Sequence, residues 1–446
     1  MVNDMGDGTK VVIIGAGPAG VAAGITVARY GLAATVIDEH DTSEAHSADM
    51  PPSISFRPHT LAWGLFPDNQ VALYADERAE SLAATAVVVA TGGHERAVAF
   101  PGWTLPGVVN IGEVCGLARQ PGGLAGKHVL IAGTGPFLLL AANEVLENGG
   151  EVAALVEARP SVAPVELVRK FADSTPTSDM NNPEEELRRR GVPIYCQSTI
   201  LSAQGDAGIT EAVVTQLRPN GQHDPDATER ITCDLLCLHA GFCAAVELAQ
   251  MVGCAVEYNV DSGGWHVRHD GEMRTSRDGV YVAGRVAGYA GHEISIASGR
   301  LAGLSVAHDL GAISAAEFTE ALEREKATID ALRLSSCQIN TYSAMESELS
   351  STITPDTLLC PEEGVRAADI DLAISLGARS FNDIKRRTRC GMGESQAHIC
   401  GPLVSAYVAH QTGVSVESVG LMTARPPIRP IPLIAVAALD QQLSQS

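Results

Sequence analysis

Aromatic side chains are scarce in this sequence: they make up 4% of its 446 residues, although 45% of the residues are hydrophobic. The apolar surface must therefore come mainly from small and aliphatic side chains, which let helices lie close to a sheet in α/β layers. Because only 19% of the residues are charged, the chain can bury a substantial core. This composition excludes a disordered or fibrous protein.

Basic residues are also few, with 31 Lys and Arg against 53 Asp and Glu and a formal net charge of -22. This charge repels phosphate backbones, so we expect no nucleic-acid partner. Apolar runs such as 129–132 and 137–142 fall far short of the roughly 20 residues that a membrane span requires. Residues 1–10 lack the basic and apolar regions of a secretory signal. We therefore expect no membrane span and a cytoplasmic location.

Cysteine is too sparse for a disulfide scaffold, with ten residues in the chain. Half of the cysteines lie in apolar or strand-like segments, where we expect inert packing: Cys196, Cys233, Cys237, Cys243 and Cys254. Residues 231–239 predict one strand, which would place Cys233 and Cys237 on the same face without forming a metal site.

Residues 10–39 predict a strand, a glycine turn, a helix and a second strand, the order of a dinucleotide-binding unit. The turn is Gly15-Ala16-Gly17-Pro18-Ala19-Gly20. Its first glycine allows the tight bend, its second lets a pyrophosphate approach the backbone, and its third brings the helix close to the strand. The helix N-terminus would present free N–H groups to the phosphates. At the end of the second strand, Asp38 or Glu39 can accept a hydrogen bond from a ribose.

Residues 127–157 predict a second unit of this kind, with the turn Gly133-Thr134-Gly135-Pro136 between a strand over 128–132 and a helix over 137–148. Leu138 occupies the third glycine position, where its side chain would hold the helix away from the strand. The pattern is equally consistent with an occupied dinucleotide site and with a vacant structural repeat.

Two further segments, 87–93 and 279–284, predict buried strands that end in small-residue turns. We expect both strands in one sheet, followed after the second by a Gly- and Ala-rich helix over about 291–304. Their ends supply further candidate cofactor-binding residues: Ala90, Thr91, Gly92 and Gly284.

The sequence changes character after residue 312. A charged helix over 315–334 precedes a Ser- and Thr-rich stretch, 335–357, with the composition of a linker. A compact segment with a basic stretch at 379–389 follows. It contains three candidate metal ligands, Cys360, Cys390 and Cys400.

Several short runs are more specific than the glycine turns. They are Ala90-Thr91-Gly92-Gly93-His94-Glu95-Arg96, Phe100-Pro101-Gly102-Trp103-Thr104-Leu105-Pro106-Gly107-Val108, Gly263-Gly264-Trp265, Thr275-Ser276 and Thr388-Arg389-Cys390-Gly391-Met392-Gly393. Together they resemble the α-type subunits of multi-subunit flavin-dependent amine and amino-acid dehydrogenases, a family that includes opine oxidases, D-hydroxyproline and L-proline dehydrogenases and a hydrogen cyanide synthase subunit.

This resemblance covers most of the chain and implies an α/β fold of the pyridine nucleotide-disulfide oxidoreductase type. Two Rossmann-like dinucleotide-binding domains would be followed by a small helical C-terminal domain. The implied bounds are 1–110 with 245–311 for the first domain, 111–244 for the second, 312–357 for the helix and linker, and 358–446 for the C-terminal domain of iron-sulfur type.

The resemblance also implies how the chemistry is divided between chains. A β subunit would carry the FAD that oxidises a small amine or amino acid at a CH–NH or CH–NH2 group. This chain would bind FAD, or ATP or FMN, at its first glycine turn, and a further FMN would lie at the subunit interface. A two-iron two-sulfur cluster would lie in the C-terminal domain. No catalytic base or nucleophile is assigned to this chain.

One departure from the family pattern concerns the flavin. The family places Asp after the glycine that ends the strand over 279–284, where it binds the ribityl chain, whereas this sequence has Arg285. A guanidinium cannot accept the ribityl hydrogen bonds, but it can bind a phosphate, which favours a mononucleotide such as ATP or FMN.

The other departure concerns the cluster. The family's ligand pattern is C-x-C followed, after a long gap, by C-x-x-x-x-C. Cys360 and Cys400 occupy the outer positions, but Glu362 and Ser395 replace the inner pair. Even with Cys390 nearby, the ligand count favours a lost cluster over a rearranged one.

Three functions are consistent with these observations. The first is the α subunit of a heteromeric flavin-dependent dehydrogenase or oxidase. The second is a non-catalytic scaffold, which the two departures favour. The third is a stand-alone NAD(P)H-dependent flavin oxidoreductase, which the two glycine turns favour.

Overall fold

The computed structural model describes residues 10–41, 51–164, 167, 183–344 and 349–437. The chain divides into two compact units, Met1–His94 with Ala244–Cys337 and Thr423–Ser446, and Glu95–Cys243 with Gln338–Met422. The finer domain bounds expected from the sequence stay a prediction. Within the described ranges, no helix combines the length and the apolar character needed to cross a membrane.

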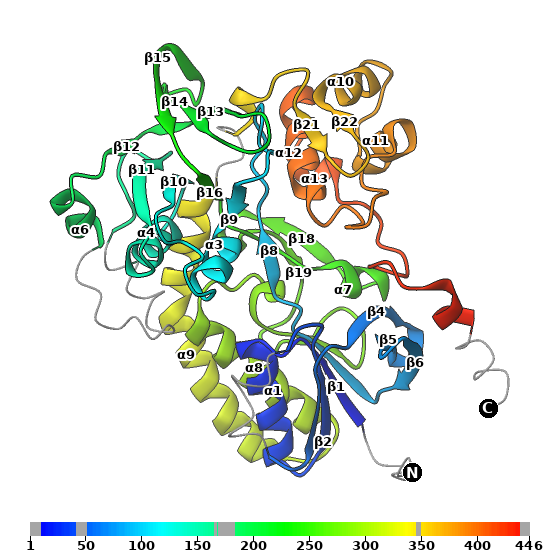
Figure 1. Ribbon diagram of the computed structural model, residues 1–446. Helices are drawn as coiled ribbons and strands as arrows, with labels where there is room; N and C mark the ends of the chain where they lie inside the picture. Colours follow the sequence, from blue (N-terminus) through cyan, green and yellow to red (C-terminus); the bar gives the residue numbers. More distant parts are fainter. Residues whose placement is uncertain (1–9, 42–50, 165–166, 168–182, 345–348, 438–446) are drawn as a thin grey trace. The chain divides into compact units, whose positions relative to one another are not determined.

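A parallel five-stranded sheet, in the order β20-β7-β1-β2-β3, lies at the centre of the first unit (Figure 1). Its strands are β1 (Lys10–Ile14), β2 (Ala33–Ile37), β3 (Ile54–Arg57), β7 (Ala86–Val89) and β20 (Val280–Val282). Strand β7 is buried along its whole length, as expected of a central strand covered on both faces. The expected pairing of segments 87–93 and 279–284 in one sheet is confirmed, since β20 and β7 are parallel neighbours.

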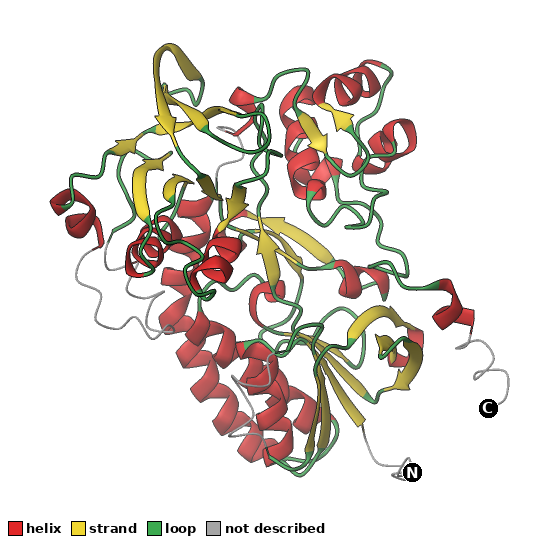
Figure 2. Ribbon diagram, viewed as in Figure 1, coloured by secondary structure: helices red, strands yellow, loops and turns green. Residues whose placement is uncertain are grey.

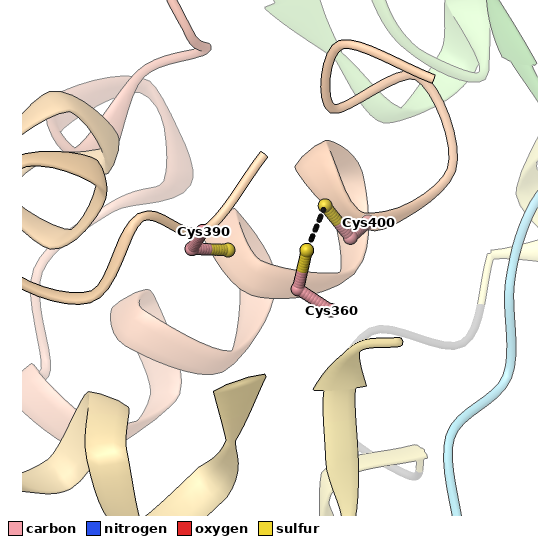
Figure 3. Close-up of side chains that lie close together, drawn as sticks. All are labelled: Cys360, Cys390 and Cys400. Atoms are coloured by element: carbon pink, nitrogen blue, oxygen red, sulfur yellow. Dashed lines mark hydrogen bonds between the residues drawn. The ribbon is translucent and has the colours of Figure 1, made fainter. Parts of the chain in front are cut away.

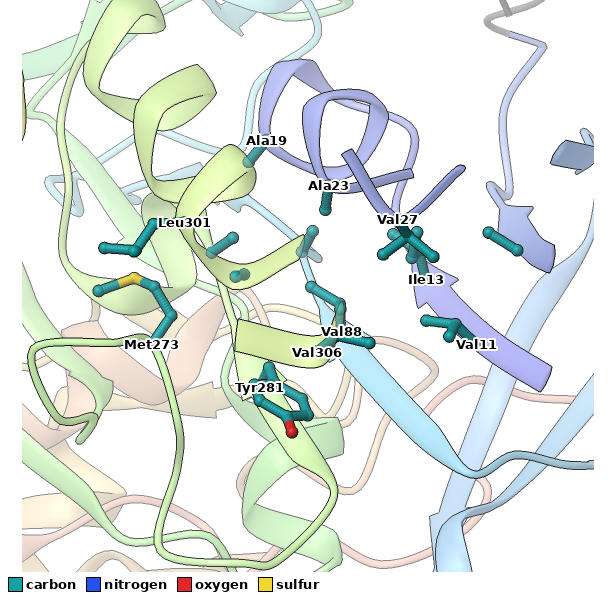
Figure 4. Close-up of a cluster of buried hydrophobic side chains, with 14 of the residues drawn as sticks. Val11, Ile13, Ala19, Ala23, Val27, Val88, Met273, Tyr281, Leu301 and Val306 are labelled. Atoms are coloured by element: carbon teal, nitrogen blue, oxygen red, sulfur yellow. The ribbon is translucent and has the colours of Figure 1, made fainter. Parts of the chain in front are cut away.

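Helices α1 (Pro18–Arg29) and α8 (His292–Asp309) pack closely against each other in the first unit. Their backbones approach because glycines lie at the contact: a Cβ on Gly299 would be 2.1 Å from the carbonyl oxygen of Ala19. Figure 4 shows side chains of both helices gathered with those of β1 and β7 in one apolar cluster. This cluster fixes the N-terminal end of α1 against the sheet.

The first unit also contains several smaller elements. They are an antiparallel sheet of β4 (Leu61–Phe66), β5 (Gln70–Ala75) and β6 (Arg78–Ala83), a hairpin of β18 (Val256–Asn259) and β19 (Gly264–Val267), and helix α7 (Glu247–Met251).

The second unit contains another parallel sheet, in the order β12-β11-β10-β16-β9. Its strands are β9 (Val108–Asn110), β10 (His128–Gly133), β11 (Glu151–Glu157), β12 (Ile194–Cys196) and β16 (Leu235–His239). Helices α3 (Ile111–Ala118) and α4 (Phe137–Glu147) share one apolar cluster with this sheet. An antiparallel sheet of β13 (Ser198–Gln204), β14 (Glu211–Leu217) and β15 (His223–Thr232) contributes to another.

The expectation of one strand over 231–239 is wrong. Strand β15 ends at Thr232 and β16 begins at Leu235, because the chain leaves an antiparallel sheet and enters a parallel one at this point. Cys233 and Cys237 are both buried, but they belong to different apolar clusters. They do not share a strand face.

The C-terminal part of the second unit is mainly helical (Figure 2). It consists of a short ladder of β21 (Leu358–Cys360) and β22 (Val365–Arg366) with helices α10 (Ala367–Ser375), α11 (Phe381–Thr388), α12 (Cys400–Thr412) and α13 (Val416–Val419). Helix α9 precedes it and runs over Ala315–Ser343. The helix expected to end at Leu334 therefore continues for nine residues into the predicted linker.

Candidate functional site

The first glycine turn has the close contacts that its sequence predicts. Gly15 adopts a positive φ of 107°, and a Cβ there would lie 2.2 Å from the Ala90 carbonyl oxygen. A Cβ on Gly20 would lie 1.8 Å from the carbonyl oxygen of Gly15. Any side chain at either position would therefore push β1, α1 and the end of β7 apart.

Gly17 differs from these two glycines because it faces open space. No described atom lies within 4 Å of a Cβ built on it. Gly17 is also the N-cap of α1, and no side chain caps this helix end. Pro18 follows at the first helical position, where its missing N–H costs no hydrogen bond. The backbone at this turn is thus open to an anionic group, which the helix dipole attracts.

Asp38 contacts this turn, whereas Glu39 does not approach it in any described hydrogen bond. One carboxylate oxygen of Asp38 accepts the backbone N–H of Ala16 at 2.7 Å, and the other accepts the N–H of His40 at 2.9 Å. The Asp38 side chain is 14% exposed and that of Glu39 is 53% exposed. Each oxygen of Asp38 keeps a second lone pair, so this carboxylate can still accept a ribose hydroxyl.

The ends of β7 and β20 complete this part of the site. Ala90 lies against Gly15, and a Cβ on Gly284 would lie 2.9 Å from that of Ala19. The Thr91 hydroxyl donates to the carbonyl oxygen of Ala245 at 2.7 Å, and the Gly92 carbonyl accepts from the N–H of Ala245. The structure thus gathers sequence-predicted residues from β1, α1, β7 and β20.

Arg285 occupies the first turn after β20, directly after Gly284. The backbone N–H of Gly284 donates to the Ser298 hydroxyl at 2.9 Å, which ties this turn to α8. Arg285 is partly buried and lies in a short 3-10 helix over Gly284–Ala287. The residues at the glycine turn therefore fit a nucleotide phosphate, while the position of Arg285 does not provide the carboxylate that a ribityl chain would use.

The second glycine turn is filled by the chain itself. A Cβ on Gly135 would lie 2.6 Å from the Ser343 hydroxyl oxygen, and one on Gly241 would lie 2.9 Å from the Ser343 Cβ. The Thr134 hydroxyl donates to the carbonyl oxygen of Tyr342 at 3.1 Å. The C-terminal end of α9 thus lies against the backbone that a dinucleotide would need to approach.

Arg159 and Glu157 reinforce this arrangement. The Arg159 guanidinium donates to the carbonyl oxygens of Tyr342 and Thr341, at 3.2 and 3.4 Å, and also to that of Ala344. A cation at these carbonyls complements the negative end of the helix dipole. Glu157, which ends β11 where a ribose would bind, is buried and accepts the N–H groups of Gly135 and Arg159.

Sequence reasoning did not predict the pairing of Glu95 with His239. Nδ1 of His239 lies 3.0 Å from Oε2 of Glu95, whose carboxylate also accepts backbone N–H groups of Ile111 and Gly112 at the start of α3. The His239 side chain is fully buried, and its Nε2 has no hydrogen-bond partner among the described residues. Glu95 belongs to a family-like run, but its partner is 144 positions away and no local pattern links them.

The three cysteines of the C-terminal segment converge as the sequence suggested (Figure 3). Their sulfur atoms lie within 4.8 Å of one another, and Sγ of Cys400 is 3.5 Å from Sγ of Cys360. Hydrogen bonds from the Cys390 and Cys400 thiols lower the pKa of Cys360. Their bonds to Cys360 raise the pKa of Cys390 and of Cys400.

Glu362 and Ser395, which replace the inner ligand pair, bond to each other. The Ser395 hydroxyl donates to Oε2 of Glu362 at 2.7 Å, and the Ser395 N–H donates to Oε1 at 3.0 Å. The described residues around these positions therefore supply three thiols instead of the four that the iron-sulfur pattern requires. A two-iron two-sulfur cluster of that pattern does not fit this site.

Two family models match this chain, one over its larger N-terminal part and one over its C-terminal part. The model described as pyridine nucleotide-disulphide oxidoreductase matches residues 9–311, and the model described as sarcosine oxidase A3 domain matches residues 355–440. The α/β fold class expected from the sequence, with its helical C-terminal region, is confirmed.

Relatives match over nearly the whole chain. An opine oxidase subunit of Rhizobium meliloti is 28% identical, and the match covers 96% of this chain and 98% of the relative's own length. Hydrogen cyanide synthase subunit HcnB of Pseudomonas protegens is 29% identical, with 97% and 98% covered. The crystal structure of L-proline dehydrogenase from P. horikoshii has a TM-score of 0.70 at 19% identity, covering 96% of this chain and 79% of that chain. The resemblance expected from the sequence is confirmed.

Proposed function

Because this chain belongs to the pyridine nucleotide-disulphide oxidoreductase family, we propose that it is the α-type subunit of a heteromeric flavin-dependent amine or amino-acid dehydrogenase or oxidase. It binds a nucleotide at its first glycine turn, and a β subunit carries the FAD that oxidises the substrate. The observation that most supports the nucleotide site is the open backbone at Gly17. Two of its relatives are named as subunits of opine oxidase and hydrogen cyanide synthase, which supports a division of labour between chains.

The chain's own residues bind and orient the nucleotide. Backbone N–H groups at the start of α1 meet a phosphate, and the carboxylate of Asp38 accepts a ribose hydroxyl from beside Ala16. Arg285 adds a cation in the turn that follows Gly284. These contacts suit ATP or FMN, and also the adenylate half of FAD.

The partner's flavin supplies the redox chemistry when bound, by accepting a hydride from the carbon of a C–N bond and leaving an imine that water hydrolyses. This chain contributes electron transfer or assembly to that reaction. An FMN between the subunits would connect the two chains.

A stand-alone NAD(P)H-dependent oxidoreductase is disfavoured by the second glycine turn. Ser343 lies against Gly135 and Gly241, where a pyrophosphate would bind. A nicotinamide dinucleotide could bind there only after the end of α9 had moved away. Electrons are therefore proposed to arrive from the partner subunit.

A non-catalytic scaffold is the second candidate, and the Glu362–Ser395 pair favours it. This pair occupies positions that would otherwise hold an electron-carrying cluster. In a scaffold, the bound nucleotide would stabilise the fold without exchanging electrons.

The proposal is tested by isolating the tagged chain from its native cells. We expect a second, FAD-containing subunit to copurify and the complex to reduce a dye when supplied with amines or amino acids. Mass spectrometry of the nucleotides released from the separated chain should identify ATP, FMN or FAD. Amine oxidation by the isolated chain, or recovery of this chain alone and without a nucleotide, would contradict the proposal.

A further inference from the structure

We propose that Cys360, Cys390 and Cys400 bind a single Zn²⁺ ion through their three sulfur atoms. This site is distinct from a two-iron cluster in ligand number, in charge and in redox behaviour. It does not depend on the function proposed above.

The distances between the sulfur atoms suit one ion. Zinc–sulfur bonds are about 2.3 Å long, so two sulfurs on a tetrahedral zinc lie about 3.8 Å apart. In the structure, Cys360 and Cys400 are 3.5 Å apart and all three sulfurs lie within 4.8 Å of one another. Movements of about 1 Å or less would bring them to bonding positions around one centre.

The three ligands come from separate segments. Cys360 ends β21, Cys390 follows α11, and Cys400 begins α12 (Figure 3). All three are buried, with at most 2% of each residue exposed. One shared ion would therefore tie together a strand, a loop and a helix.

Two backbone features, one beside Cys360 and one beside Cys400, complement negative charge on sulfur. The backbone N–H of Gly391 donates to Sγ of Cys360 at 3.3 Å. Cys400 is the first residue of a 13-residue helix whose N-terminus has no side-chain cap, a position where the helix dipole stabilises a thiolate. On binding, Zn²⁺ displaces the three thiol protons, which pass to solvent. A water molecule would supply the fourth ligand, as at zinc sites with three protein ligands.

The residues around the cysteines do not fit a two-iron cluster of the family's pattern. A two-iron cluster of the expected pattern needs a pair of thiolates at each end. The positions of the inner pair are held by Glu362 and Ser395, whose side chains bond to each other at 2.7 Å. Zinc carries no redox chemistry, so the site would stabilise the C-terminal segment without carrying electrons.

Metal analysis of the full-length chain, purified without metal-binding tags and dialysed against a weak chelator, tests this proposal. We expect about one zinc per chain, with neither iron nor acid-labile sulfide in stoichiometric amount. Two irons with two sulfides would overturn the proposal, and so would a folded chain that contains no metal and takes up none from added Zn²⁺.

Matched variants locate the ion. Cys390→Ala should lose the zinc, whereas Cys233→Ala should keep it, since Cys233 is an equally buried cysteine in another apolar cluster of the same unit. Retention of zinc by Cys390→Ala, or its loss from Cys233→Ala, would overturn the assignment.

Cobalt substitution needs no variant and so does not depend on variant folding. Co²⁺ bound to the wild-type chain should give intense thiolate-to-cobalt charge-transfer bands and the visible bands of a tetrahedral ion, both removed by added Zn²⁺. A spectrum typical of Co²⁺ bound only by oxygen and nitrogen would contradict three sulfur ligands. A final experiment incubates the wild-type chain with iron and sulfide under anaerobic conditions. Formation of an iron-sulfur cluster on the chain would also contradict the proposal.

Discussion

The carboxylate of Glu157 accepts the backbone N–H of Gly135 at 3.3 Å, inside the second glycine turn. Burial raises the pKa of Glu157 to about 7, and the N–H groups of Arg159 and Gly135 oppose this rise only in part. The folded protein therefore holds a proton that the unfolded chain releases near pH 4.5. Between these two pH values, the free energy of unfolding falls as pH rises.

Glu157→Gln should remove this pH dependence because an amide does not ionise. Its single oxygen can accept only one of the two N–H bonds, from Gly135 or from Arg159, so some stability is lost equally at every pH. Urea unfolding should show that, between about pH 5 and pH 8, the free energy of unfolding of wild type falls by about 2 kcal/mol more than that of the variant. Glu151→Gln is the control, since Glu151 begins the same strand with its side chain 70% exposed. An identical pH profile for Glu157→Gln and wild type would contradict a protonated Glu157.

The end of α9 should keep nicotinamide nucleotides out of the second turn, because Ser343 lies against its backbone. Titration of the wild-type chain with NADH or NADPH should show no saturable change in nucleotide fluorescence. Saturable binding would contradict a filled site.

Arg159→Ala should loosen the end of α9. The three carbonyls at that helix end would lose their cationic donor, at a cost of about 2 kcal/mol in the free energy of unfolding. Arg188→Ala, which removes an exposed ion pair with Glu184, should cost about 0.5 kcal/mol or less. Equal losses for the two variants would show that Arg159 does not hold the helix end.

Gly20→Ala should destabilise the first unit. The new Cβ would lie 1.8 Å from the carbonyl oxygen of Gly15, so α1 must move away from β1 at a cost of about 3 kcal/mol. Gly116→Ala in α3 is the matched control, because no described atom lies within 4 Å of its Cβ and Ala favours a helix. Thermal unfolding of both variants would test this difference, and equal melting temperatures would refute the close contact.

Gly17→Leu should fold but lose the bound nucleotide. Gly17 has an ordinary φ of -68°, and its side-chain position is open, so the loss of a favourable N-cap costs only about 1 kcal/mol. The added side chain would cover the backbone that a phosphate approaches. The amount of nucleotide recovered from the purified variant, measured by mass spectrometry, should be at least about tenfold lower than from wild type. A tenfold loss of affinity corresponds to about 1.4 kcal/mol of binding energy. Gly116→Leu should retain the nucleotide.

The same variant separates the two functions proposed for this chain. Complex activity that survives loss of the nucleotide would favour a scaffold, whereas its loss in a complex that still assembles would favour electron transfer. Undiminished nucleotide content in Gly17→Leu would contradict the placement of the phosphate.

The shape of the first glycine turn could be predicted because its determinants are local. Four features lie within eleven consecutive residues, and each requires a particular residue type. They are a strand, the bend at Gly15, a helix start without a side chain at Gly17, and the close backbone contact at Gly20. The replacement of the inner ligand pair by Glu362 and Ser395 could also be predicted, by comparing the sequence with the ligand pattern of the family that it resembles. The break between β15 and β16 could not, because residues 231–239 are apolar enough for one strand and only the change of sheet divides them.

Tertiary structure alone decided what occupies the second turn. Its sequence permits a dinucleotide, but Ser343, more than 200 positions after Gly135, lies against the turn where a pyrophosphate would approach. Local sequence fixes the shape of a backbone bend because sterics act between neighbouring residues. Whether a ligand or another part of the chain fills that bend depends on packing between distant segments, as do the pairing of Glu95 with His239 and the convergence of three thiols.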